Sequence, residues 1–225
     1  MASLDQMIAL LRLEHLGSAE LQRRLGISQP TVSRMIKQAG QRVIRLGRGR
    51  ATRYAAASSV FGAGHSQPLF EVDASGRVAQ VARLMALAGG GYVVEAPTSP
   101  AWLLGESQTG IFESLPYFLH DLRPSGFLGR LLARTLATEW GFPADPRAWT
   151  DTEIGEYLLR RGHDLPGNLV VGRRAAERAN LHETTSIEDR SEAYPRLARQ
   201  VLSHEAPGSS AAGEQPKFAI HQREV

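Results

Sequence analysis

The side chains best suited to bind a ligand lie in a short polar stretch near the N-terminus. This stretch carries hydroxyl, amide, guanidinium and ammonium groups on Ser28, Gln29, Thr31, Ser33, Arg34 and Lys37. Such groups donate hydrogen bonds to phosphate oxygens and to base edges. Apolar residues interrupt them at helical spacing, namely Val32, Met35 and Ile36. On a helix the apolar set would face a core and leave the polar set outside.

Two helices joined by a tight turn would position this polar face. A first helix is predicted by an apolar stripe formed by Leu4, Met7, Ile8 and Leu11. Gly17 ends it, and Ser18 is the expected N-cap of a second helix that stops at Gly26. Ser28 then caps a third helix, which tolerates Pro30 in its first turn. Two helices joined by a glycine-containing turn, the second polar and basic outside, form a helix-turn-helix unit.

A β-hairpin is predicted directly after the third helix. Residues alternate in polarity on either side of the glycine-rich tip 47–50. Arg48 and Arg50 at the tip could reach a minor groove or the flanking backbone, and Arg53 follows on the second strand. Residues 18–34 resemble bacterial winged-helix regulators, in which such a hairpin is the wing. The prediction is a winged helix-turn-helix domain over residues 1–57; the alternative is a helical bundle used only for protein contacts.

The charge distribution favours a polyanionic partner for this N-terminal part. The 225-residue chain has a net charge of +3, but residues 1–60 hold 10 Lys and Arg against 3 Asp and Glu. The other residues hold 16 against 20. A basic head on a weakly acidic body indicates that the head binds nucleic acid, with double-stranded DNA as the expected partner.

Composition excludes several other classes of site. The chain has no cysteine, which excludes disulfides and thiolate metal sites. Its seven histidines lack the spacing to carboxylates that metal ligands show, so no metal site is expected. The sequence has neither an apolar run of about 20 residues nor a basic signal at its start. We therefore expect a cytoplasmic protein without membrane contact.

Beyond the head, the sequence predicts a mixture of helices and strands. Residues 58–67 are rich in Ala, Ser and Gly and predict a linker. Strands are expected at 69–72, 78–87, 92–94 and 169–171, with helices after Thr150 and at about 195–203. The glycines at 89–91 indicate a turn, because no Lys-Ser or Lys-Thr follows them as in a phosphate loop. The fold class is α+β, with the body at 68–225.

Three blocks of the body, 118–129, 162–169 and 210–217, resemble the HipA-like serine/threonine kinase toxins that carry an N-terminal winged helix. The resemblance implies a HipA-like N-terminal subdomain followed by the start of a kinase lobe. It identifies the last block as the glycine-rich loop over the ATP phosphates, formed by Ser210, Ala211, Ala212, Gly213 and Lys217. Small residues let backbone N–H groups approach an anion. By resemblance Ser210 is the autophosphorylated loop serine; a flexible linker is the alternative for this segment.

Catalytic residues are not expected within this chain. Phosphoryl transfer needs an aspartate for the nucleophile and an acid–amide pair for Mg²⁺, and in this family those residues follow the loop. The chain ends at Val225, so we expect an N-terminal portion that is inactive alone and binds no cofactor by itself. ATP and Mg²⁺ are expected only for the complete kinase.

Three functions therefore compete for this chain. The first is a sequence-specific DNA-binding regulator, by analogy a homodimer that reads paired half-sites of its own operator. The second is an ATP-dependent protein kinase toxin, for which the family suggests a substrate in translation. The third is a one-component repressor with the body as sensor.

Overall fold

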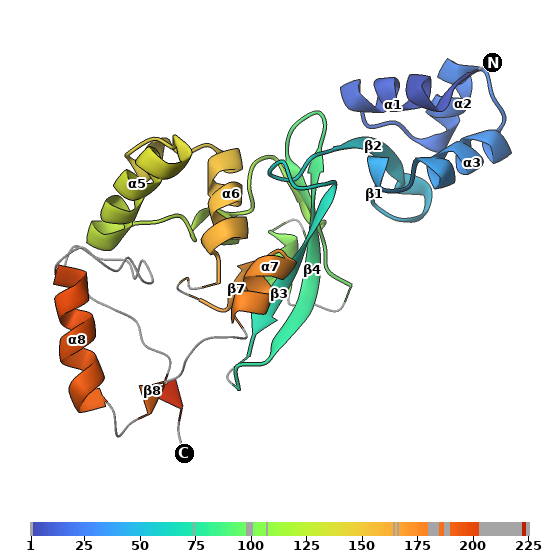
Figure 1. The fold of residues 1–225 in the computed structure, drawn as a ribbon. Helices are drawn as coiled ribbons and strands as arrows, with labels where there is room; N and C mark the ends of the chain where they lie inside the picture. The colour runs from blue at the N-terminus through green and yellow to red at the C-terminus, as the bar shows by residue number, and fades with distance from the viewer. Residues whose placement is uncertain are drawn as a thin grey trace. The chain divides into compact units, whose positions relative to one another are not determined.

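A computed structural model of the chain describes residues 2–73, 75–97, 101–106, 108–163, 165, 167–179, 185–186, 190–202 and 222–223. The chain folds into two compact units. The first comprises residues 1–68 and 81–116, and the second comprises residues 69–80 and 117–225. Figure 1 shows helices together with mainly antiparallel strands, which confirms the α+β class.

Three helices open the first unit: α1 (Leu4–Leu13), α2 (Ser18–Leu25) and α3 (Gln29–Ala39). Their apolar stripes meet in one core, with Met7, Leu11, Leu21, Val32 and Met35 among its buried members. Helix α2 starts at Ser18, one residue earlier than expected, because Gly17 and not Ser18 is the N-cap. It ends at Gly26 in the left-handed conformation (φ 63°), which lets the chain turn directly into α3.

Strands of the first unit form an antiparallel sheet in the order β1, β2, β4, β5, β6. Their bounds are β1 (Val43–Leu46), β2 (Arg53–Ser58), β4 (Val78–Leu87), β5 (Tyr92–Glu95) and β6 (Ile111–Phe112). Short 3-10 turns lie at Gly40–Arg42, Gly49–Ala51 and Ala101–Leu104. The strand β2 has two partners: it pairs with β1 along its first residues and with β4 through Ala57 and Ser58. The hairpin after α3 therefore continues into the sheet.

A second core joins this hairpin to β4 and β5. Its buried members are Ile44, Leu46, Ala55, Leu87 and Val93. One side of the hairpin is thus covered by the sheet of the same unit. Such packing restricts how far the hairpin can move relative to β4.

Residues 58–67, expected to be a linker, are anchored at two apolar side chains. Val60 is fully buried and Phe61 is 8% exposed. The Phe61 ring lies 5.9 Å from that of Tyr92, and the Val60 amide donates to the carbonyl of Gly64 at 2.7 Å. The small residues of this segment predicted a flexible linker. Burial of the Val60 and Phe61 side chains holds it in place, because removing apolar surface from water stabilises the folded arrangement.

The glycines after β4 form the expected turn. The Leu87 amide donates to the Gly91 carbonyl at 3.0 Å, and the Gly90 amide donates to the Leu87 carbonyl at 3.1 Å. A Cβ atom at position 91 would lie 2.5 Å from the carbonyl oxygen of Phe112. Close approach of the next strand therefore requires glycine here, which accounts for the motif without a phosphate ligand.

The second unit is largely helical. Its helices are α4 (Tyr117–His120), α5 (Gly126–Trp140), α6 (Asp151–Arg161), α7 (Arg173–Ala179) and α8 (Arg190–Leu202), with a 3-10 turn at Pro146–Ala148. The strands β3 (Ser66–Val72) and β7 (Leu169–Val171) pair antiparallel, and β8 (Thr185–Ser186) pairs parallel with β9 (Gln222–Arg223).

Helix α6 starts at the predicted capping box. The Thr150 amide donates to the Glu153 carboxylate at 2.7 Å, and the Glu153 amide donates to Thr150 Oγ1 at 3.4 Å. Tyr157, on the buried face of α6, begins a row of edge-on aromatic contacts that continues through Trp149 and Phe142 to Trp140. Among the described residues, no helix is long and apolar enough to cross a bilayer.

Candidate nucleic-acid interface

Helix α3 presents the predicted polar residues on its outer side. Ser28, Gln29, Ser33, Arg34 and Lys37 are all exposed, whereas the intervening Val32 is fully buried. Thr31 is half-buried, and its hydroxyl lies 3.0 Å from that of Ser28. Ser28 is the N-cap as expected, but its side chain contacts Thr31 and not a backbone amide. The exposed set can therefore reach a ligand without rearrangement of the core.

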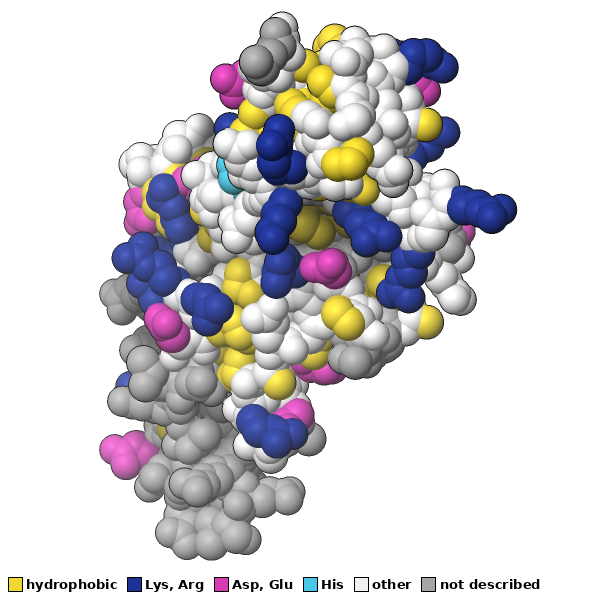
Figure 2. Space-filling model, turned by 90° about the vertical axis from the view of Figure 1, so that its right-hand side faces the viewer, with side chains coloured by type: hydrophobic (Ala, Val, Ile, Leu, Met, Phe, Trp, Pro, Cys, Tyr) yellow, Lys and Arg dark blue, Asp and Glu magenta, His cyan; other side chains and the backbone are white. Residues whose placement is uncertain are grey.

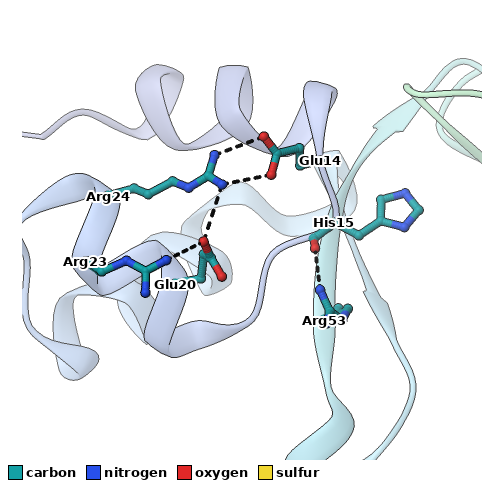
Figure 3. A network of polar contacts seen from close by, with 6 residues as sticks. All are labelled: Glu14, His15, Glu20, Arg23, Arg24 and Arg53. Carbon is teal, nitrogen blue, oxygen red and sulfur yellow. Dashed lines mark hydrogen bonds and ion pairs between the residues drawn. The ribbon is translucent and has the colours of Figure 1, made fainter.

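A network of ion pairs links α2 to Glu14 at the end of α1 (Figure 3). Arg24 donates to both carboxylate oxygens of Glu14, at 3.1 and 2.8 Å, and lies 3.3 Å from Glu20. Arg23 contacts Glu20 at 2.7 Å. The hydrogen bond from Arg24 lowers the pKa of Glu14 below its usual value. These two arginines of α2 are thus engaged with carboxylates, so the cations offered to a ligand lie elsewhere.

The hairpin supplies such cations at its tip. Arg48 and Arg50 are exposed in the loop between β1 and β2. Arg45 on β1 is exposed as well and donates to Thr52 Oγ1 at 3.3 Å. Figure 2 shows Lys and Arg side chains across one face, with Asp and Glu side chains interspersed among them.

Arg53 occupies a different position from the tip arginines. Its guanidinium donates to the carbonyl oxygen of His15 at 3.1 Å (Figure 3). Next to it, Leu16 and Tyr54 exchange backbone hydrogen bonds of 3.0 and 2.8 Å. Arg53 thereby holds the hairpin against the segment after α1, a role that its sequence position did not reveal. That it also binds DNA remains a prediction.

A hollow of about 420 Å³ separates the start of α2 from the hairpin. Ser18 and Ala19 line it on one side, and Arg45, Arg50 and Thr52 line it on the other. Backbone N–H groups at a helix start and guanidinium groups both favour anions. The hollow therefore has the donors that a phosphate group requires.

The predicted nucleotide loop lies outside the described residues. This holds for Ser210, Ala211, Ala212, Gly213 and Lys217, so their predicted role stays a prediction. Within the described part of the chain, no group of three or more acidic or histidine side chains could hold a metal ion.

Comparison with known protein families identifies the family of the segment after the hairpin. A family described as "YjjJ-like toxin, middle domain" matches residues 63–180, more than half of the chain. This chain belongs to the YjjJ-like toxin family. The matched segment begins after β2 and leaves the three-helix head and its hairpin outside. Membership supports the toxin part of the resemblance inferred from the three blocks.

A curated relative from the YjjJ-like family is similar in sequence along nearly the whole chain. "Toxin YjjJ" of Escherichia coli (strain K12) is 35% identical over 207 residues, which make up 90% of this chain. The same residues make up 44% of the relative, so the chain spans less than half of that protein's length. No solved structure gives a significant match.

Proposed function

We propose that residues 1–57 are a winged helix-turn-helix domain that binds double-stranded DNA sequence-specifically, as part of a HipA-like toxin of the YjjJ-like family. The observation that carries this proposal is the exposed polar side of α3, held on a fully buried core and flanked by a hairpin with arginines at its tip. A bundle used only for protein contacts would not need this arrangement of donors.

In this proposal α3 enters the major groove and the hairpin follows the neighbouring backbone. Arg34 can pair with O6 and N7 of guanine, and Gln29 can pair with N6 and N7 of adenine. Lys37, one turn farther along, is suited to a phosphate. The hollow at the start of α2 would take a second phosphate. We propose that the protein binds its own operator in the cytoplasm as a homodimer. The two half-sites would then lie one helical turn apart.

Selection of bound duplexes from a random pool tests the proposal with the whole chain. We expect an enriched motif, and we expect two copies of it about 10 base pairs apart if the protein binds as a dimer. A variant with Gln29→Ala and Arg34→Ala should enrich a different or weaker motif. A pool that stays random under conditions in which the protein is folded would contradict DNA reading by α3.

A second function, protein kinase toxin, is favoured by the family membership. In it the segment from Ser210 to Lys217 covers the ATP phosphates, Mg²⁺ bridges them, and the protein substrate belongs to translation. The test incubates the full-length protein with radiolabelled ATP. Label that disappears on Ser210→Ala would support autophosphorylation at this serine, whereas equal label on the variant would contradict it.

A further inference from the structure

A second hollow on the first unit lies outside the predicted DNA-binding face. It has a volume of about 290 Å³ and is formed by the end of α3, the base of the hairpin and the strands β4 and β5. Its polar lining residues are Gln41, Arg45, His65, Ser66, Arg83 and Glu95. Four of them, His65, Ser66, Arg83 and Glu95, belong to the segment that matches the family and not to the predicted winged helix.

Arg83, one of the two arginines that line this hollow, is only weakly neutralised. Arg83 and Glu95 are register partners on β4 and β5, and Arg83 Nη1 lies 3.9 Å from Glu95 Oε2. Their side chains are 50% and 58% exposed, so the pair contributes little energy and competes poorly with another anion. A guanidinium in this state still has N–H groups to offer to a phosphate.

Arg45 connects the two hollows, because it lines both. Arg50 lines only the hollow beside α2, and Arg83 lines only the hollow beside the sheet. The three arginines, which we call the arginine row, thus line two hollows of the first unit that share Arg45. Backbone phosphates of a duplex repeat at short intervals, so such a row matches a nucleic-acid strand better than a single small anion.

Packing keeps this row in a fixed arrangement. The strand β2 pairs with both β1 and β4, and the core of Ile44, Leu46 and Leu87 lies between the hairpin and the sheet. Arg45 on β1 and Arg83 on β4 are therefore held by one continuous sheet. A rigid surface binds without an ordering cost, which favours its use as an interface.

We propose that Arg83, together with Arg45, binds a DNA backbone phosphate beside the recognition site, so that the DNA interface extends from the winged helix into the toxin's middle domain. This inference rests on the proposed function. Contacts to phosphate add affinity but carry no base information. Arg83 would consequently set how tightly the protein binds any sequence.

The test compares Arg83→Gln with Arg12→Gln in the whole chain. Both variants lose one positive charge, but Arg12 is exposed on α1 and lines neither hollow. Arg83→Gln should lower the affinity for selected and scrambled duplexes by similar factors and flatten the log–log salt slope by about 0.9. Arg12→Gln should leave the slope unchanged. Glu95→Gln should raise the affinity at low salt, because it removes the competing carboxylate.

The outcomes separate this inference from the proposed function. If the protein binds DNA and Arg34→Ala weakens that binding, but Arg83→Gln behaves like Arg12→Gln, then only the extended interface is wrong. If the chain binds no DNA, both proposals fail. If Arg83→Gln leaves DNA binding intact but abolishes binding of inorganic phosphate, the hollow is a small-anion site and the inference is overturned. Melting curves of each variant show that the compared proteins are folded.

Discussion

Arg34 and Lys37 lie one turn apart on the exposed side of α3 and should play different parts in DNA binding. Arg34→Ala should cost about 1–3 kcal/mol on the best site and relax the preference at one or two base pairs, because its guanidinium reads a base. Lys37→Ala should weaken all sequences equally, because it contacts phosphate. Competition with single-base variants of the selected site measures both effects.

Both variants should melt like the unchanged protein, since neither side chain belongs to the core around Val32. An equal loss of affinity for every base variant on Arg34→Ala would make Arg34 a backbone contact and leave the base reading to other residues.

Asp73, in the turn before β4, should titrate far below an ordinary carboxyl group. Its carboxylate accepts from Ser75 Oγ at 2.6 Å and from the amides of Ser75 and Arg77 at 2.9 and 3.0 Å. These hydrogen bonds, the Ser75 hydroxyl foremost, lower the pKa of Asp73 to about 2. Because the folded pKa lies below the ordinary 3.8, the stabilisation is present above pH 3.8 and is lost as the pH falls toward 2.

Carbon-detected NMR titration measures the pKa of Asp73 directly. Ser75→Ala should move it upward toward its ordinary value, whereas Ser66→Ala, outside the turn, should not. A pKa near 3.8 in the unchanged protein would show that the turn does not form as described.

Some single-residue roles were predictable because they are local. The caps at Ser28 and Thr150 follow from three or four neighbouring residues. By contrast, Arg53 bonds to His15, 38 positions away, and Arg24 bonds to Glu14, on a different helix. Nothing in residue spacing indicates such partners, so sequence reasoning assigned Arg53 to DNA and did not recognise its contact with His15.

At the scale of elements, periodicity predicted α3 and the hairpin after it, the glycines predicted the turn at Gly89–Gly91, and the capping box predicted the start of α6. These signals are all local in the sequence. They did not predict that β2 has two partners, because pairing with β4 brings together strands that are far apart in the sequence. The same limit applies to residues 58–67, whose small residues are typical of a linker. Burial of Val60 depends on contacts with residues that are distant in the sequence, and these contacts could not be predicted.

The shared core of hairpin and sheet can be tested at Leu87, which is 5% exposed. Leu87→Ala should lower the free energy of unfolding of the first unit by about 2–3 kcal/mol, because it leaves a cavity next to Ile44 and Leu46. Hydrogen exchange of peptides covering β1 and β2 should speed up accordingly. The matched control is Leu13→Ala, at a side chain that is 81% exposed, with an expected cost below about 0.5 kcal/mol. Equal effects of the two substitutions would contradict packing of the hairpin on the sheet.

At the scale of the whole molecule, the family boundary does not coincide with a boundary between compact units. The family segment starts at residue 63, within the unit formed by residues 1–68 and 81–116. Part of the segment that matches the family's middle domain thus folds in the same compact unit as residues 1–62. The sequence predicted separate domains at 1–57 and 68–225, because charge and composition change between them. Composition does not reveal which strands pair across that boundary.

The tip arginines should set the salt dependence of DNA binding by the whole chain. Affinity should fall on a log–log plot with a slope of about −0.9 per phosphate neutralised. Arg48→Ala combined with Arg50→Ala should flatten that slope while the preferred sequence stays the same, because the tip contacts backbone. The slope is measured by titration of salt against a labelled selected duplex. An unchanged slope would mean that the hairpin does not act as a wing.

The most direct test of sequence-specific DNA binding is the ratio of affinities for the selected duplex and a scrambled duplex of the same composition. Measured with the whole chain at about 0.15 M salt, this ratio should be about 10³ or more, as for proteins that read base edges. Replacement of Gln29 and Arg34 by alanine should bring it down strongly while the protein stays folded. A ratio near one for the unchanged protein would contradict the account, because its basic surface would then bind polyanions without reading their sequence.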